Sequence, residues 1–291
     1  DKAWFFWVNK EFMAPPHYPI AGRPTLVALS LSFFLPFLSP AQSADNAPKK
    51  GHYIEFGIGY QFQRFKDVRH SSIYRNAGGV SYRLAYRAMN EKRQHVIGIN
   101  FASTNSNQEF ASLISNILGG LYYEHLRKIN NHIWLGGYYD LGAFYGNRGG
   151  EWANPEDNPT WGAWSSIGVS ASLRKNFGNG WSIDPSIRLP LLAYTVRPAY
   201  GFPYPESFLQ EGRFSFIEEG MTKEVIKSGK FQTLNNFMNL QLSCGLHKGF
   251  GNRRHQIGIQ YQTGYLFFNG EKPFADWQNQ ISIISKFNLK K

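Results

Sequence analysis

The chain has 291 residues, with 31 lysines and arginines against 20 aspartates and glutamates. Only 18% of the residues are charged, against about 25% in an ordinary soluble domain, while 16% are aromatic and 29 are glycine. This composition argues against a disordered chain, a coiled coil and a helix bundle, and the negative mean hydropathy argues against a polytopic helical membrane protein. The single cysteine, Cys244, excludes an intramolecular disulfide and a cysteine-cluster metal site.

The N-terminal region carries an apolar run at residues 25–38, which follows the basic Arg23. Its roughly 14 residues are too few for a helix across a bilayer of ~30 Å and are typical of a signal-peptide core. Small residues suited to cleavage follow at 41–44. With Met13 as the expected start, we expect residues 1–44 to comprise upstream read-through and a signal peptide, and 45–291 to form one exported domain.

Period-2 alternation dominates the chain after Pro48. In residues 80–88, for example, apolar side chains at even positions alternate with Ser81, Arg83 and Arg87, which gives a strand with one apolar and one polar face. The predicted strands are much longer than the 5–6 residues of an average globular strand. We expect ten of them, near 52–64, 77–90, 93–104, 110–128, 131–147, 162–176, 180–195, 232–249, 253–269 and 276–289.

Short and long connections alternate between these segments. Tight turns are expected at 90–92, 129–131, 177–180 and 250–253, and longer loops at 65–76, 104–110, 147–162, 196–231 and 269–276. This alternation predicts an all-β, up-and-down antiparallel meander whose two ends differ, as in a transmembrane β-barrel of about ten strands.

The region after residue 50 resembles a bacterial outer-membrane β-barrel protein. The resemblance is carried by the signal-like segment, the alternating residues 79–87 and the last strand, 281–287, although four residues follow its aromatic Phe287. It implies a location in the outer membrane, with short periplasmic turns and long external loops. The partners it implies are lipopolysaccharide outside, phospholipid inside and the barrel-assembly machinery; no nucleic acid is expected.

Basic pairs and aromatic residues accompany the tight turns. The basic pairs are Lys49-Lys50, Lys92-Arg93, Arg127-Lys128, Arg174-Lys175, Arg253-Arg254 and Lys290-Lys291. We expect them on one rim, where they would meet anionic head groups, unless they are ordinary exposed turn residues. The expected aromatic girdle near that rim comprises Trp134, Trp181, Phe177, Phe250 and Phe287.

The polar strand faces predict a lumen whose charged side chains have both signs. The inward positions include Glu55, Arg83, Arg87, Glu124, Asp140, Asp184, Arg188, Gln241, Gln260, Gln262 and Gln280. Because a barrel of about ten strands has little room for bulk water, these side chains are expected to pair. They would form either a polar plug or a narrow ligand pocket, whereas a wide general porin needs roughly 16–18 strands.

The seventh predicted strand contains Pro185 and Pro190, with Pro198 just beyond. Proline cannot donate to a strand ladder, so a bulge or inward bend is expected there. Bulges re-aim side chains near sites, and Arg188, Tyr194 and Arg197 are therefore further candidates for a binding cluster. The long loop 196–231 that follows is predicted to fold as a lid over the external opening.

No catalytic motif is defensible, and no cofactor or metal site is expected. Asp67, His70, Glu151, Glu156 and Asp157 lie on predicted external loops, where the ten-stranded omptin proteases carry acidic pairs and an Asp-His pair. Asn130-Asn131-His132 is better interpreted as a turn. The sequence thus predicts an outer-membrane protein with a structural, binding or transport role. The alternative is an outer-membrane hydrolase of lipid or peptide, with its site on the external loops.

Overall fold

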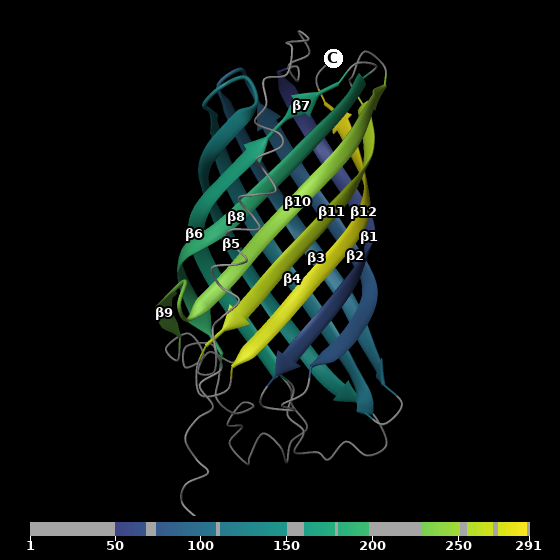
Figure 1. Ribbon diagram of the computed structural model, residues 1–291, viewed down its shortest axis with the longest axis vertical. Helices are drawn as coiled ribbons and strands as arrows, with labels where there is room; N and C mark the ends of the chain where they lie inside the picture. The colour runs from purple at the N-terminus through teal and green to yellow at the C-terminus, as the bar shows by residue number, and fades with distance from the viewer. Residues whose placement is uncertain are drawn as a thin grey trace, which may run out of the picture. The chain divides into compact units, whose positions relative to one another are not determined.

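The computed structural model describes residues 50–67, 74–108, 111–149, 160–177, 180–197, 229–250, 255–269 and 273–289. Ten long strands and two short ones, β7 (Lys175–Asn176) and β9 (Lys230–Thr233), run through these residues (Figure 1). The long strands are β1 (Gly51–Asp67), β2 (Arg75–Met89), β3 (Arg93–Gln108), β4 (Ala111–Lys128), β5 (Ile133–Gly149), β6 (Thr160–Leu173), β8 (Trp181–Val196), β10 (Phe237–Phe250), β11 (His255–Phe268) and β12 (Phe274–Asn288).

The long strands form a closed antiparallel barrel. From β1 to β6, and again from β10 to β12, each strand pairs with its neighbour in the chain. The circle is completed by β6 pairing with β8, β8 with β10, and β12 with β1. No long strand in the described residues is left with a free edge, which confirms the predicted up-and-down barrel and its ten strands.

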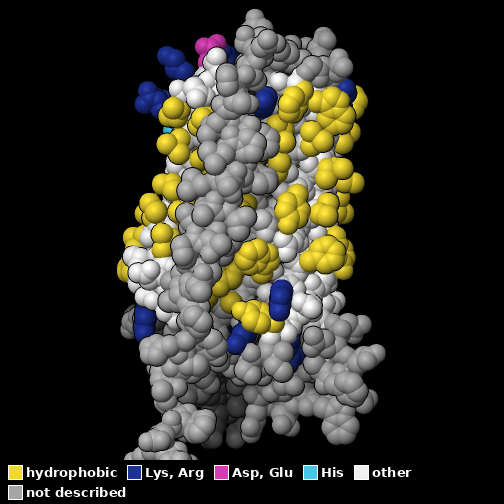
Figure 2. All heavy atoms as spheres, viewed as in Figure 1, with side chains coloured by type: hydrophobic (Ala, Val, Ile, Leu, Met, Phe, Trp, Pro, Cys, Tyr) yellow, Lys and Arg dark blue, Asp and Glu magenta, His cyan; other side chains and the backbone are white. Residues whose placement is uncertain are grey.

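The alternating side chains divide into an outer apolar face and an inner polar face, as the sequence predicts. On the outer face Phe56, Leu84 and Ile283 are 47%, 52% and 59% exposed, whereas the inward Glu55 and Ser282 are each 2% exposed. Figure 2 shows apolar side chains along the flank of the barrel, with lysine and arginine side chains toward both of its ends. The outer surface of the barrel is therefore formed largely by apolar side chains, whose exposure to water is unfavourable.

The barrel end at the top of Figure 1 is formed by short turns. Asparagine side chains shape two of them: Asn90 Oδ1 accepts hydrogen bonds from the backbone N–H groups of Lys92 and Arg93, at 2.9 and 2.7 Å. Asn130 Oδ1 likewise accepts from the N–H groups of His132 and Ile133, at 2.9 and 2.8 Å. Both are Asx turns, which explains why asparagine stands at these positions.

The connection between β3 and β4 is shorter than predicted. The sequence predicts a loop over 104–110, but the two strands continue to pair as far as Gln108 opposite Ala111. Thr104 and Ser106 remain on the inner face and are each 1% exposed. A ladder depends on backbone hydrogen bonds, so polar side chains can extend a strand beyond its apolar segment.

A β-bulge interrupts β8, as its prolines predict. The register between β6 and β8 shifts at Pro190, which leaves Leu191 without an opposite residue. The extra residue changes which positions face the lumen: Arg188 faces inward before the bulge, and the buried Thr195 faces inward after it.

The eighth predicted strand, 232–249, is divided in the structure. Residues 234–236 form a turn that separates β9 from β10. β9 pairs only with the end of β8, where Tyr194 lies opposite Phe231, and β10 then joins the barrel wall. The predicted alternation holds within β10 and does not extend back through the turn.

The rim of short turns carries some of the predicted basic and aromatic residues. Phe177, Trp181, Phe250 and Phe287 are 41–51% exposed, but Trp134 is 4% exposed and packs inside the barrel, so the prediction for Trp134 is wrong. The exposed Lys50 lies 2.8 Å from Glu91, and its hydrogen bond lowers the pKa of that carboxyl. The contact of this rim with phospholipid remains a prediction.

The expected signal peptide, its cleavage site and the predicted start at Met13 lie outside the described residues. Most of the predicted lid, from 198 to 228, also lies outside them. No helix in the described part of the chain has the length and hydropathy needed to cross a membrane.

Candidate functional site in the lumen

The lumen contains three groups of buried ionic side chains near the short-turn end. The first joins neighbouring strands β1 and β2: Arg87 Nε donates to Glu55 Oε1 at 2.5 Å, and Arg83 Nη2 lies 3.8 Å from Glu55 Oε2. Arg83 Nη1 also donates across the lumen to Gln260 Oε1 on β11, at 3.0 Å. One carboxylate thus holds two guanidinium groups on the inner wall.

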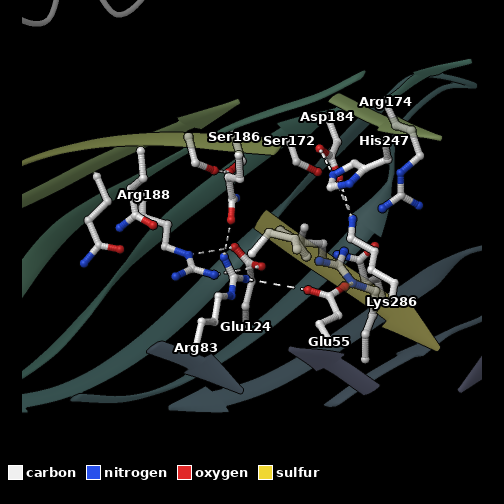
Figure 3. Close-up of a pocket in the computed structure, with 18 residues that line it drawn as sticks. Glu55, Arg83, Glu124, Ser172, Arg174, Asp184, Ser186, Arg188, His247 and Lys286 are labelled. Atoms are coloured by element: carbon white, nitrogen blue, oxygen red, sulfur yellow. Dashed lines mark hydrogen bonds and ion pairs between the residues drawn. The ribbon is translucent and has the colours of Figure 1, made fainter. Parts of the chain in front are cut away.

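The second group spans the barrel from β4 to β8. Arg188 Nε and Nη2 donate to the two oxygens of Glu124, at 3.2 and 3.4 Å. Ser170 Oγ donates to the same carboxylate, and the Arg188 guanidinium lies 4.2 Å from the centre of the Tyr122 ring. Figure 3 shows Arg188 and Glu124 directed toward each other. This bidentate ion pair links β4 to β8, which are separated in the wall by β5 and β6.

The third group comprises Asp184, His247 and Lys286. His247 Nε2 lies 2.9 Å from Asp184 Oδ1, and Lys286 Nζ donates to Asp184 Oδ2 at 3.0 Å. Lys286 Nζ also lies 3.1 Å from His247 Nε2. The three residues come from β8, β10 and β12, so the cluster bridges the strands that complete the barrel.

These groups surround a small cavity (Figure 3). It offers about 50 Å³ to the centres of water molecules, and since one water needs about 10–15 Å³ on this measure, the cavity holds only a few. Its lining consists of Glu55, Arg83, Arg87, Gln94, Glu124, Leu126, Ser172, Arg174, Asp184, Ser186, Arg188, Gln241, Ser243, His247, Gln260, Gln262, Ile284 and Lys286.

An aromatic plug fills the lumen toward the long-loop end. Its buried members are Phe65, Ala77, Phe144, Trp164, Ala193, Phe237, Leu266, Phe268 and Phe274. The Phe144 and Phe274 rings stack with their centres 4.3 Å apart, and the Arg197 guanidinium lies 5.0 Å from the Phe274 ring centre. Arg197 Nη2 also pairs with Asp67 Oδ1 at 2.7 Å. The charged side chains at this plug, Arg197 and Asp67, are therefore paired with each other and buried.

A smaller apolar plug lies at the short-turn end. It is formed by the buried side chains of Tyr53, Met89, Leu126 and Trp134. Along β1 the inner face therefore passes from Tyr53 in this plug, to Glu55 at the cavity, to Phe65 in the aromatic plug. The charged cavity thus lies between the aromatic plug and this smaller cluster, whose members come from β1, β2, β4 and β5.

Polar groups between the cavity and the aromatic plug are also paired. Asp140 Oδ2 accepts hydrogen bonds from Trp164 Nε1 at 2.6 Å and from Asn239 Nδ2 at 2.8 Å. Gln63 Oε1 accepts from Thr104 Oγ1 at 2.5 Å, and Gln63 Nε2 donates to Asp276 at 3.3 Å. Hydrogen-bonded side chains therefore occupy part of the lumen between the cavity and the aromatic plug.

The sequence-derived candidates fall at three places. Glu55, Arg83, Arg87, Glu124, Asp184 and Arg188 line the cavity, while Asp140 and Arg197 lie toward the aromatic plug. Tyr194 is on the opposite face of β8 from the buried Ala193, and its ring centre lies 5.1 Å from that of Phe231. The structure does not bring Arg188, Tyr194 and Arg197 together.

Sequence analysis missed three cationic or titratable side chains at the cavity. His247 and Lys286 have the inward parity of their strands, since they alternate with Leu246 and Phe287, and this signal was available. Arg174 was assigned to the basic rim with Lys175, but it lines the cavity. It shares the parity of the inward Ser172, so the same signal was available for Arg174.

The described candidates for hydrolytic chemistry have structural roles. Asp67 is 4% exposed and paired with Arg197, and His132 follows Asn130 in an Asx turn. His70, Glu151, Glu156 and Asp157 lie outside the described residues. The described part of the chain contains no group of three or more histidine, cysteine or acidic side chains placed to hold a metal ion.

No protein-family model matches the sequence, and no curated protein sequence matches it. Among solved structures the chain is similar to the translocator domain of the autotransporter NalP from Neisseria meningitidis, at 9% identity and a TM-score of 0.40, covering 91% of this chain and 97% of that one. It is also similar to the beta domain of the Bordetella autotransporter Brka, at 10% identity and 0.40, covering 83% and 100%. For neisserial surface protein A the values are 11% and 0.37, covering 82% and 97%.

The described strands meet the demands that a bilayer makes of a protein. A closed barrel satisfies its backbone hydrogen bonds within its own wall, because it has no edge. Its outer face is apolar and its inner face polar, which is the reverse of a water-soluble protein. The chain is a closed antiparallel β-barrel of the membrane-spanning type.

Proposed function

We propose that this protein is a closed, non-conducting outer-membrane barrel that serves as an anchor for binding at its external end. The observation that carries the proposal is the filled lumen: an aromatic plug and a smaller apolar plug lie on either side of the charged cavity. An ion crossing this lumen would have to leave water twice, and apolar constrictions oppose that by dewetting.

The position of the longest connection supports a binding role. β8 ends at Val196 and β9 begins at Lys230, so residues 197–229 connect them at the end opposite the short turns. Connections of this length in compact domains are usually functional. In outer-membrane barrels the longer loops are external, so this segment would meet partners outside the cell.

Conductance across planar lipid bilayers tests the closed lumen. We expect no stable conductance steps from the refolded wild-type barrel. The double variant Phe144→Ala/Phe274→Ala removes the stacked pair of the aromatic plug, and we expect it to admit ions. Ile283→Ala, on the lipid face, is the matched control and should behave as wild type. Stable conductance by the wild-type protein would refute the proposal.

Deletion of residues 203–228 distinguishes a barrier formed by the aromatic plug from one formed by a lid. A lid over an open lumen predicts that the deletion raises conductance. Because the plug residues belong to the strands themselves, we expect the shortened protein to stay closed. A deletion that opened the barrel would place the barrier in the loop and support transport instead.

A further inference from the structure

The side chains around the lumen cavity carry an excess of positive charge. Five cationic side chains line it, Arg83, Arg87, Arg174, Arg188 and Lys286, against three carboxylates, Glu55, Glu124 and Asp184. Five minus three leaves +2, with His247 counted as neutral. Charges withdrawn from water need compensation, so the cavity as built favours a negative partner.

The excess is concentrated at Arg174. Within the described part of the chain its guanidinium donates from Nη1 to the sulfur of Met89 at 3.2 Å, and a thioether is a weak acceptor. The three carboxylates instead pair with Arg87, with Arg188, and with Lys286 and His247. Figure 3 draws no ion pair from Arg174, which lines the cavity together with His247 and Lys286.

Further polar side chains line the same cavity, among them Arg83, Gln241 and Ser243. The hydroxyl-bearing Ser172 lies two residues before Arg174 on the same wall and also lines the cavity. Guanidinium groups bind the planar or tetrahedral oxygens of carboxylate and phosphate through paired N–H donors.

We infer that the lumen cavity binds a small oxyanion, of the phosphate, sulfate or short-carboxylate class, with Arg174 as its principal ligand. The available space holds only a few water molecules, which suits an anion of four or five heavy atoms and excludes a nucleotide or a sugar phosphate. The bound anion would neutralise the excess charge and bridge β6 to the strands that complete the barrel. The inference is independent of whether the external loops bind a partner.

Calorimetric titration of the refolded full chain with sodium phosphate tests this inference, in a nonionic detergent and an organic buffer at constant ionic strength. We expect saturable binding by wild type and at least a roughly tenfold loss of affinity in Arg174→Gln, because a charge-assisted hydrogen bond contributes about 1.5–3 kcal/mol. Arg127→Gln, which removes an exposed cation from the short-turn rim, is the control and should bind as wild type.

A second variant, Ser172→Asp, places a permanent carboxylate beside Arg174. It should abolish phosphate binding and raise the thermal unfolding temperature of the anion-free barrel, which also reports on the site if Arg174→Gln fails to fold. The inference is overturned if wild type shows no saturable binding of phosphate, sulfate or acetate. It is equally overturned if Ser172→Asp binds phosphate as wild type does, or if Arg127→Gln loses as much affinity as Arg174→Gln.

Discussion

Glu124 shows how single residues stabilise the inside of this barrel. Its carboxylate accepts hydrogen bonds from Arg188 and Ser170, and its side chain is 7% exposed. In such a setting the pair gains little over two apolar residues, because both charges lose hydration. What the pair does provide is a fixed connection between β4 and β8.

Removing one member of this pair should therefore cost more than removing both. We expect Glu124→Gln to lower the free energy of unfolding by about 3–5 kcal/mol, because Arg188 would keep a buried charge without its carboxylate. The double variant Glu124→Gln/Arg188→Met should recover most of that loss. Denaturant unfolding in lipid vesicles, followed by tryptophan fluorescence, measures both. Equal destabilisation by the two variants would contradict the role given to the pair.

On the outer face of the barrel, by contrast, side chains need to be apolar. Leu84 is 52% exposed on the lipid side, whereas its neighbour in the same strand, Ser81, is 2% exposed inside. We expect Leu84→Arg to cost about 2–4 kcal/mol, because an arginine is placed near the middle of the bilayer. Ser81→Ala, which removes a hydroxyl without a partner in the described residues, should have little effect. Heat-modifiable gel migration reports assembly, and normal assembly of Leu84→Arg would reverse the assignment of faces.

At the scale of elements, β8 is the strand that departs most from a regular ladder. Pro190 cannot donate a backbone hydrogen bond, and the bulge at Leu191 absorbs the resulting mismatch. The same bulge changes parity, so that Ala193 and Arg197 reach the aromatic plug although Arg188 reaches the cavity. Because of the bulge, β8 contributes inward side chains both to the cavity and to the aromatic plug.

Deletion of Leu191 tests this function of the bulge. Without the extra residue the end of β8 would shift by one position, which turns every following side chain to the other face. We expect the deleted protein to fail to assemble, since Arg197 would face lipid. Pro190→Ala keeps the number of residues and should assemble normally. Assembly of the deletion variant at wild-type yield would show that the bulge is dispensable.

The sequence predicts the strands well because a barrel wall repeats one simple pattern. Alternation identifies ten strands and places Glu55, Arg83 and Asp184 inward, since parity is a property of the strand alone. It fails where the turn at 234–236 interrupts the predicted eighth strand. Arg174 was assigned to the rim with Lys175, although it shares the parity of the inward Ser172. Trp134 was assigned by its nearness to a turn, although its parity matches the inward Tyr138.

The partners inside the lumen lie beyond this kind of prediction. Lys286 and Asp184 are 102 positions apart in sequence, and they meet because β8 and β12 both take part in completing the barrel. The aromatic plug gathers residues from several strands in the same way. Parity indicates that these side chains face inward, but only the register of all ten strands determines which of them share a layer.

The whole molecule is a lipid-facing wall around a layered interior. In the described part of the lumen two clusters of apolar side chains lie on either side of a charged layer, and the proposed closed lumen rests on this arrangement. A barrel of this size has an interior that side chains are able to fill. Function at the external loops would then depend on the barrel as a rigid anchor rather than as a pore.

Paramagnetic broadening of isoleucine methyl signals tests this account most directly, because Ile283 and Ile284 are adjacent yet face opposite ways. Ile283 is 59% exposed on the outer face, whereas Ile284 is 2% exposed and lines the cavity. In detergent micelles we expect a lipid-soluble nitroxide to broaden Ile283 and spare Ile284, and a small water-soluble nitroxide to broaden neither. Broadening of Ile284 by the water-soluble agent would mean an open lumen and would contradict the account.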